Sequence, residues 1–368
     1  MPTTLDRIEI EGFKSIRQVR LDLKPLNVLI GANGAGKSNF ISVFGLLRHI
    51  VEGRLQFYVA QAGGADALLH YGRKQTPELM LRLSFETSSY EAKLAPSAAD
   101  SLIFALESGM TSWGAENPQP GAISGQDEAK LSGHDESVLL KAGTEQDSVR
   151  SALKRIQDWR VYHFHDTSAS AKVKQTGDIG DNEALRPDAA NLAALLFLLR
   201  TKHPESYRRI VSTLRLVAPF FGDFRLRPSP FNEQKIQLEW SERNSEAYFN
   251  AHALSDGTLR FICLATLLLQ SHLPSLILID EPELGLHPYA IQVLAGLVRS
   301  ASEKTQVILS TQSVSLVNQF EPEDLVVVDR SKGESVLRRL SAEDTKDWLE
   351  GYSLGELWEK NVFGGRPG

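Results

Sequence analysis

One short segment near the N-terminus has the residue types and spacing that bind a chain of phosphates. Gly31 to Ser38 reads Gly-Ala-Asn-Gly-Ala-Gly-Lys-Ser and fits the pattern G-x-x-x-x-G-K-[ST] in full. Its glycines let backbone N–H groups curl around phosphate oxygens, and a helix that follows adds partial positive charge. Lys37 then places a charge between the β- and γ-phosphates, and the Ser38 hydroxyl ligates Mg²⁺. The predicted nucleotide-binding residues of this loop are Gly31, Asn33, Gly34, Ala35, Gly36, Lys37 and Ser38.

A second set of candidate residues follows an apolar run. Leu276 to Ile279 contains four apolar residues, and Asp280 and Glu281 come directly after it. This pattern predicts a buried strand whose carboxyl end points at a ligand, which is where α/β sheets bind ligands. Asp280 would hold Mg²⁺, directly or through water, and Glu281 would be the general base that polarises the attacking water. Together with Lys37, these acids predict Mg²⁺-dependent hydrolysis of ATP.

The elements around these motifs can be predicted from hydrophobic periodicity. Leu26 to Ile30 is a short apolar run typical of a buried parallel strand, and a helix is expected from Ser38 to about Val51. The last third of the chain, from Asp256 to Val328, alternates helices and strands and therefore predicts a parallel sheet.

The middle of the chain has a different pattern. Period-two alternation between Leu79 and Ala142, with Val138 and Leu140 at its end, predicts an antiparallel meander. A long loop is expected from Gly109 to Gly133, which is rich in Gly, Pro, Ser and Gln. The pattern turns helical from Leu185 to about Ala218, with Asn191 as an N-cap.

Composition limits the class of protein. The chain has 368 residues, a formal net charge of −6 and 42% hydrophobic residues, which is ordinary for a globular protein of more than one domain equivalent. This charge gives no general footprint for tight sequence-independent nucleic-acid binding. Cys263 is the only cysteine, so an intramolecular disulfide and a cysteine-rich zinc site are excluded. We expect a cytoplasmic protein, because the apolar runs are shorter than the about 20 residues of a membrane helix. No membrane partner is expected.

A third motif carries a family resemblance. Leu254-Ser255-Asp256-Gly257-Thr258 precedes a predicted helix and Ser255 lies 25 residues before Asp280. It resembles the signature motif of ABC-type ATPases, usually L-S-G-G-Q, in the variant style of SMC-, RecF- and OLD-like members. In that family the signature serine and glycine grip the γ-phosphate held by the other subunit. The resemblance therefore implies nucleotide contacts from Ser255 and Gly257, and a homodimer that forms on ATP.

Further segments resemble the same class. Glu11 to Ser15 is similar to the N-terminal strand turn of SMC/RecF-type heads, which implies that Lys14 approaches the nucleotide; Asn39, after the loop, also matches. Glu283 to Pro288 resembles the D-loop of predicted bacterial AAA-family ATPases. Ser310 to Ser313 lies where the family has a switch histidine.

Gln312 stands in place of that histidine. A glutamine can donate a hydrogen bond to a γ-phosphate oxygen but cannot carry a proton charge. We therefore assign Gln312 to the catalytic residues, with Glu281 and Lys37, and expect slow turnover with nucleotide affinity retained. Gln61 is a candidate for the Mg²⁺-sensing glutamine of these ATPases. His163 and His165 could form a metal pair, although a structural role is the simpler interpretation.

The resemblance implies an α/β fold, the P-loop NTPase fold of an ABC-ATPase head, with a mixed sheet core, an antiparallel β meander and a helical insert. A long coiled coil and a Toprim nuclease domain are not expected. The predicted segments are 1–184 with the P-loop and meander, 185–250 with the helical insert and strands, and 251–368 with the signature helix, the acids and the strands that rejoin the core.

Three functions remain open. The first is an ATP-dependent motor or switch in DNA repair or anti-phage defence, acting with a separately encoded nuclease or other effector and with DNA as a candidate partner. The second is a transporter-type ATPase subunit, which the large middle region and the Phe13-Lys14-Ser15 turn disfavour. The third is a nucleotide-gated scaffold without hydrolysis, which Gln312 favours and Glu281 disfavours.

Overall fold

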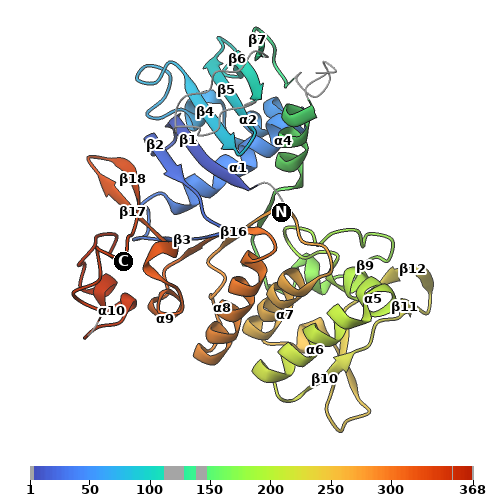
Figure 1. Ribbon diagram of the computed structural model, residues 1–368. Coiled ribbons are helices and arrows are strands. Elements are labelled where there is room, and N and C mark those ends of the chain that lie inside the picture. The colour runs from blue at the N-terminus through green and yellow to red at the C-terminus, as the bar shows by residue number, and fades with distance from the viewer. Residues whose placement is uncertain (1–3, 112–127, 138–146, 350, 367–368) are drawn as a thin grey trace. The chain divides into compact units, whose positions relative to one another are not determined.

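The structure is a computed structural model that describes residues 4–111, 128–137, 147–349 and 351–366. The chain divides into two compact units (Figure 1). The first unit combines Met1–Trp159 with Pro322–Gly368, and the second is Arg160–Glu321. The first unit therefore joins sequence from both ends of the chain. The expected division at residues 184 and 250 stays a prediction.

The first unit contains a meander, the P-loop strand and its C-terminal partner strands. Its elements are β1 (Leu5–Phe13), β2 (Ile16–Asp22), β3 (Leu26–Ile30), α1 (Lys37–Val51), α2 (Leu55–Ala62), α3 (Ala65–Leu68), β4 (Leu79–Phe85), β5 (Ser88–Pro96), β6 (Leu102–Thr111), β7 (Glu128–Leu131), α4 (Asp147–Asp158), η3 (Pro322–Asp324), β17 (Leu325–Ser331), β18 (Glu334–Arg339) and α10 (Leu354–Glu359).

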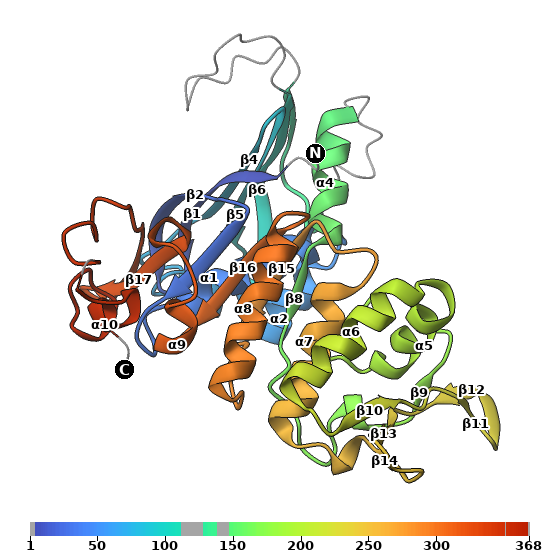
Figure 2. The same ribbon diagram turned by 60° about the horizontal axis from the view of Figure 1, so that its bottom comes forward.

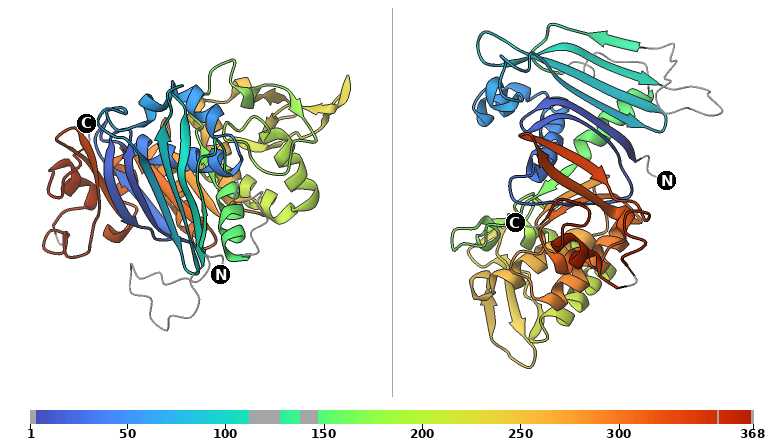
Figure 3. Two further views of the ribbon diagram at one scale, coloured as in Figure 1. Left: turned by 90° about the horizontal axis from the view of Figure 1, so that it is seen from above. Right: turned by 90° about the vertical axis from the view of Figure 1, so that its left-hand side faces the viewer.

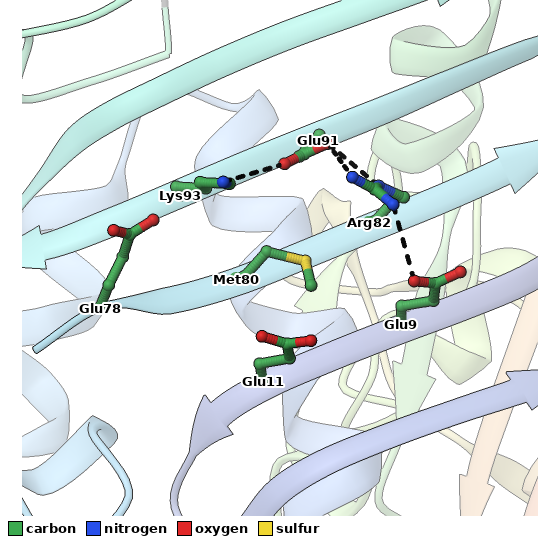
Figure 4. A pocket seen from close by; sticks show the side chains of 7 residues that line it. All are labelled: Glu9, Glu11, Glu78, Met80, Arg82, Glu91 and Lys93. Carbon is green, nitrogen blue, oxygen red and sulfur yellow. Dashed lines mark hydrogen bonds and ion pairs between the residues drawn. The ribbon is translucent and has the colours of Figure 1, made fainter. Parts of the chain in front are cut away.

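The meander is an antiparallel sheet in the order β2-β1-β4-β5-β6-β7. Its strands alternate between a buried apolar face and a polar face, as β4 does with Leu81 inward and Arg82 outward. Helices α2 and α4 contact the sheet at β5 and β6, and α1 packs against both helices. Figure 4 shows the polar face, where Arg82 pairs with Glu91 at 2.7 Å. The predicted antiparallel meander is thus confirmed.

The loop expected from Gly109 to Gly133 is wrong at both of its ends. Strand β6 continues to Thr111, and residues 128–131 form β7, whose Ala129 lies opposite Gly109. Backbone ladder bonds to a neighbouring strand outweigh the turn-like composition there. Val138 and Leu140, which were expected to end the meander, lie outside the described residues.

Strand β3 lies next to the end of the chain rather than next to the meander strands that precede it. It is buried along its length and runs parallel to β17, and β17 pairs antiparallel with β18. Ser335 of β18 donates its backbone N–H to the Ser15 carbonyl at 2.7 Å. Figure 3 accordingly shows β17 and β18 beside β1 and β2 in its right-hand view.

The second unit contains a small parallel sheet, a helical layer and two short antiparallel sheets. Its elements are β8 (Arg160–Tyr162), η1 (Lys172–Lys174), β9 (Gly177–Asp178), α5 (Leu192–Lys202), α6 (Pro204–Val217), β10 (Phe221–Phe224), β11 (Pro228–Ser229), β12 (Asn232–Ile236), β13 (Glu239–Glu242), β14 (Tyr248–Asn250), η2 (Ala251–Ala253), α7 (Asp256–Leu269), β15 (Leu276–Asp280), α8 (Pro288–Ser302), β16 (Gln306–Thr311) and α9 (Val314–Val317).

Strand β15 is the centre of the parallel sheet. It is parallel to β16 on one side and to β8 on the other, which confirms the parallel sheet predicted from the alternation of helices and strands. Helices α6, α7 and α8 pack against one another and lie side by side in Figures 1 and 2. The carboxyl ends of β15 and β16 therefore bring Asp280 and Ser310 opposite each other.

The start of α5 is predicted correctly, but the role expected for Asn191 is wrong. Asn191 occupies the N-cap position without a side-chain capping bond. Its side chain instead accepts from the Arg186 N–H at 2.9 Å and donates to the Ala184 carbonyl at 2.8 Å. The preceding loop competes for this side chain, as short polar side chains often allow.

Candidate nucleotide site

The backbone of the P-loop is held tightly at both ends and open in the middle. Helix α1 follows Gly36, whose φ of 117° lies in the left-handed region. A Cβ on Gly36 would overlap the Ser335 hydroxyl, and one on Gly31 would overlap the Val328 carbonyl. No described atom lies within 4 Å of a Cβ built on Gly34. The glycine spacing thus reflects close backbone packing at the ends of a loop whose centre is accessible.

Lys37 lies inside this loop. Its ammonium donates to the Gly31 carbonyl at 2.6 Å and to the Ala32 carbonyl at 3.1 Å, and the residue is only 5% exposed. Gly36 is the N-cap residue of α1, and because it has no side chain it makes no capping bond to the first turn of the helix. Ser38 lies in that first turn and is exposed. An open helix N-terminus with an enclosed ammonium and an accessible hydroxyl fits a phosphate chain with a bound divalent cation.

A hydroxyl network fixes the end of the loop. Ser15 Oγ accepts from the Asn39 amide at 2.7 Å and lies 2.7 Å from Ser335 Oγ. Ser335 in turn donates to the Ala35 carbonyl at 2.6 Å. Residues from β1–β2, α1 and β18 therefore hold Ala35, and Asn39 takes part in this network.

Lys14 occupies the turn between β1 and β2. Its φ is 48°, and its ammonium donates to Ser42 Oγ at 3.2 Å and lies 5.3 Å from the centre of the Phe13 ring. Burial lowers the pKa of Lys14 from its ordinary value. The lysine thus faces the first turns of α1, and its contact with nucleotide stays a prediction.

The second unit carries the acids. Asp280 ends β15 and accepts a hydrogen bond from the Ser310 hydroxyl, while its carbonyl is 2.9 Å from His165 Nε2. Glu281 adopts a left-handed φ of 44°, and its N–H donates to the Ser310 carbonyl at 3.0 Å. A non-glycine residue in this region is strained and must be held by its surroundings.

Gln312 lies against the predicted base. Its side-chain amide donates a hydrogen bond to the Glu281 carboxylate. The two residues come from the ends of neighbouring parallel strands, β15 and β16. The structure therefore brings together two of the three residues that the sequence suggested for catalysis, both within the second unit.

Glu283, which the sequence placed only at the start of the D-loop-like segment, contacts the turn that carries Gln312. Its Oε1 accepts from the Thr311 hydroxyl at 2.5 Å and from the Gln312 N–H at 3.1 Å. Its Oε2 is buried and has no hydrogen-bond partner among the described residues. Burial raises the pKa of the Glu283 carboxyl, and the charge of Glu281 adds to this effect. The position of Glu283 shortly after two acids was the available signal.

The signature segment begins a helix. Ser255 is the exposed N-cap of α7, and its hydroxyl accepts from the Thr258 N–H at 3.2 Å. Asp256 is exposed in the first turn, where a negative charge is favourable. A Cβ on Gly257 would overlap the Gly285 carbonyl, so this glycine permits close contact with the segment after the acids.

Arg260 strengthens that contact and was missed in the sequence. Its guanidinium donates to the carbonyls of Leu284 at 2.8 Å, Phe164 at 3.0 Å and His165 at 2.8 Å. Three carbonyls on one guanidinium fix α7 to two loops at once. No local pattern marks this arginine, because its partners lie far apart in the sequence.

The described residues bear on the predictions of a histidine metal pair and of a membrane helix. They contain no group of three or more His, Cys, Asp or Glu residues arranged to hold a metal ion, and His165 instead contacts the Asp280 carbonyl. In the same part of the chain, no helix is long and apolar enough to cross a membrane. Gln61 lies on the exposed side of α2.

Comparison with protein families identifies the class. Residues 128–318, more than half of the chain, match the family described as "AAA domain, putative AbiEii toxin, Type IV TA system", and residues 4–63 match "AAA ATPase domain". The chain belongs to this AAA family. The similarity to an Old nuclease and to Smc heads supports the SMC/OLD-like ABC type that the signature and P-loop implied.

Individual relatives agree with this class. The chain is 23% identical over 392 residues to the Old nuclease of Escherichia phage P2, covering 96% of this chain and 64% of the relative. The chain thus spans less than two thirds of that relative's length.

Solved structures are similar in fold. An Smc head bound to the C-winged helix domain of ScpA superposes with a TM-score of 0.57 at 16% identity, covering 94% of this chain and 99% of that one. An Smc head with an extended coiled coil, bound to the C-terminal domain of ScpA from Pyrococcus furiosus, gives 0.52 at 14% identity, with 95% and 99% covered. The predicted P-loop head fold is confirmed.

Proposed function

We propose that this chain binds ATP with Mg²⁺ at the P-loop and hydrolyses it with Glu281 as the general base. The observation that carries the proposal is the glycine-bounded loop Gly31–Ser38 between β3 and α1, with the Lys37 ammonium enclosed in it. Family membership supports the same activity.

The roles of the residues follow from their chemistry. Backbone N–H groups of the loop and Lys37 would bind the phosphates. Ser38 in the first unit and Asp280 in the second are each a candidate Mg²⁺ ligand, and a bound Mg²⁺ would supply positive charge to the phosphates. Glu281 orients the attacking water and takes its proton. Gln312 holds the Glu281 carboxylate through its amide, which orients the base but supplies no transferable proton.

A single substitution tests hydrolysis. Glu281→Gln removes the base and keeps the shape of the side chain, so turnover falls by about 10²- to 10⁴-fold while ATP affinity is retained. The measurement is phosphate release together with equilibrium binding of a fluorescent ATP analogue, and the control is Glu303→Gln at the exposed end of α8. Wild-type turnover in the Glu281→Gln protein would remove the base assignment. A native chain that binds ATP without releasing phosphate would support the scaffold function instead.

We also propose that ATP closes a two-fold homodimer. Ser255 is exposed at the start of α7, which leaves its turn available to a second copy, and the family resemblance implies that it completes a partner's site. Light scattering on the Glu281→Gln protein should give a dimer with Mg-ATP and a monomer with Mg-ADP. Ser255→Arg should block closure while ATP binding by the monomer persists. Equal masses with both nucleotides would contradict this model.

For the biological role we propose a motor or switch that works on DNA with a separate effector in repair or anti-phage defence. The support is the relation to a phage nuclease and the SMC-head fold. The test is purification from the native host with Mg-ATP or Mg-ADP, followed by assays for DNA and for nuclease activity. Copurification of a membrane permease instead would favour the transporter function.

A further inference from the structure

Glu283 forms the bridge between the segment after β15 and the turn after β16. One oxygen of its carboxyl accepts both the Thr311 hydroxyl, at 2.5 Å, and the Gln312 backbone N–H, at 3.1 Å. These two donors are consecutive residues at the point where β16 ends. Two bonds to one oxygen fix the direction in which the chain leaves the strand.

The same turn is held from its other side. Thr311 Oγ1 also accepts from the Ser313 N–H at 2.9 Å, and Ser313 caps α9 by accepting from the Leu316 N–H at 3.2 Å. Thr311 is fully buried. Residues 311–313 therefore have little freedom as long as the Glu283 carboxyl is in place.

The contacts of Glu283 also affect Glu281, the proposed general base. Gln312 is bound to Glu283 through its backbone and to Glu281 through its side-chain amide. A shift of the Gln312 backbone would move the amide away from the Glu281 carboxylate. Glu281 itself has a left-handed backbone, so its orientation depends on such contacts.

The interactions of Glu283 require an acceptor oxygen at Oε1 and do not use Oε2, which is buried without a partner among the described residues. A buried carboxylate in that situation is costly, and the raised pKa of Glu283 agrees with a carboxyl that readily takes up a proton. A neutral amide can supply the same acceptor oxygen.

We propose that Glu283 is a positioning residue for hydrolysis: its Oε1 fixes the turn 311–313 so that the Gln312 amide orients Glu281. This inference rests on the proposed ATPase activity, and its role is separate from that of Glu281. The two glutamates therefore have different requirements. Glu281 needs a carboxylate that accepts a proton, whereas Glu283 needs only an oxygen that accepts hydrogen bonds.

The experiment compares Glu283→Ala, Glu283→Gln and Glu281→Gln in the full chain, with kcat, KM and ATP affinity measured for each. Glu283→Ala should lower kcat by about 10- to 100-fold through misplacement of the base, with KM and affinity near wild type. Glu283→Gln should restore most of the turnover, because the acceptor oxygen is kept. Glu281→Gln should remain inactive.

Thr311→Val gives a second route if Glu283→Ala unfolds, which thermal melting would show. It removes one of the two donors to Glu283, and the acceptor of the Ser313 N–H, at nearly constant volume. The bond from the Gln312 N–H to Glu283 is kept, so kcat should fall by less than in Glu283→Ala, again without a change in ATP affinity. The inference is overturned if Glu283→Ala or Thr311→Val has wild-type kcat, or if Glu283→Gln is as impaired as Glu283→Ala. Wild-type turnover in Glu281→Gln would instead overturn the assignment of Glu281 as the base, and with it the role of Glu283 in orienting that base.

Discussion

The P-loop region, Gly31 to Asn39, and the acid region, Asp280 to Glu283 with Ser310 to Gln312, are held by different kinds of contact. In the P-loop region, backbone carbonyls hold Lys37, and Val328 and Ser335 pack where a Cβ on Gly31 or Gly36 would lie. In the acid region, side chains hold side chains. The difference indicates that substitutions in the P-loop region change binding and folding, whereas substitutions in the acid region change turnover at nearly constant affinity.

The largest effect on nucleotide affinity is expected for Lys37→Ala. Loss of the enclosed ammonium removes hydrogen bonds to charged phosphate, each worth about 1.5–3 kcal/mol, so ATP affinity should fall by about 10- to 100-fold or more. The measurement is equilibrium titration with a fluorescent ATP analogue. Lys93→Ala on the polar face of β5 is the control and should bind normally. Unchanged affinity in Lys37→Ala would contradict the claim that substitutions in the P-loop region change nucleotide binding.

Gly36→Ala should have the next largest effect, on stability. A left-handed alanine costs about 1–2 kcal/mol, and overlap with Ser335 adds a packing cost of about 1–3 kcal/mol. Gly34→Ala is the control, since its φ of 75° is also left-handed but its surroundings are open. In thermal unfolding, Gly36→Ala should have a clearly lower melting temperature than Gly34→Ala. Equal melting temperatures would show that the Ser335 side chain moves away from the added Cβ without a cost in stability.

Ser335→Ala removes the hydroxyl that donates to the Ala35 carbonyl. Its loss should cost about 1–2 kcal/mol of unfolding free energy, because a buried carbonyl is left without its donor. Urea unfolding measures this change. Ser331→Ala at the exposed end of β17 should be nearly neutral. A neutral Ser335→Ala would mean that the loop does not depend on β18.

Gln312→His should have the smallest effect on affinity and either raise turnover or leave it unchanged. A histidine can supply both an N–H donor and a titratable proton. Single-turnover phosphate release separates the chemical step from binding, with Gln292→His on the exposed face of α8 as the control. A large fall in rate would show that the amide itself is required at Glu281.

The P-loop could be predicted from sequence because its glycines, lysine and serine are consecutive and its flanking strand and helix are local patterns. The strand ending at Asp280 was predictable for the same reason. The contacts of Ser335 and Arg260 were not, because their partners lie far along the chain and no short motif marks them. Strand β7 was missed because its pairing with β6 outweighs local composition.

The packing of β17 and β18 around the P-loop has a consequence for biosynthesis. Gly31 and Gly36 leave the ribosome long before Val328 and Ser335, against which they pack. Strand β3 likewise waits for its parallel partner β17. Contacts of such long sequence separation form late. A nascent chain thus completes the packing around its P-loop only after Ser335 has been made, about 300 residues after the loop itself.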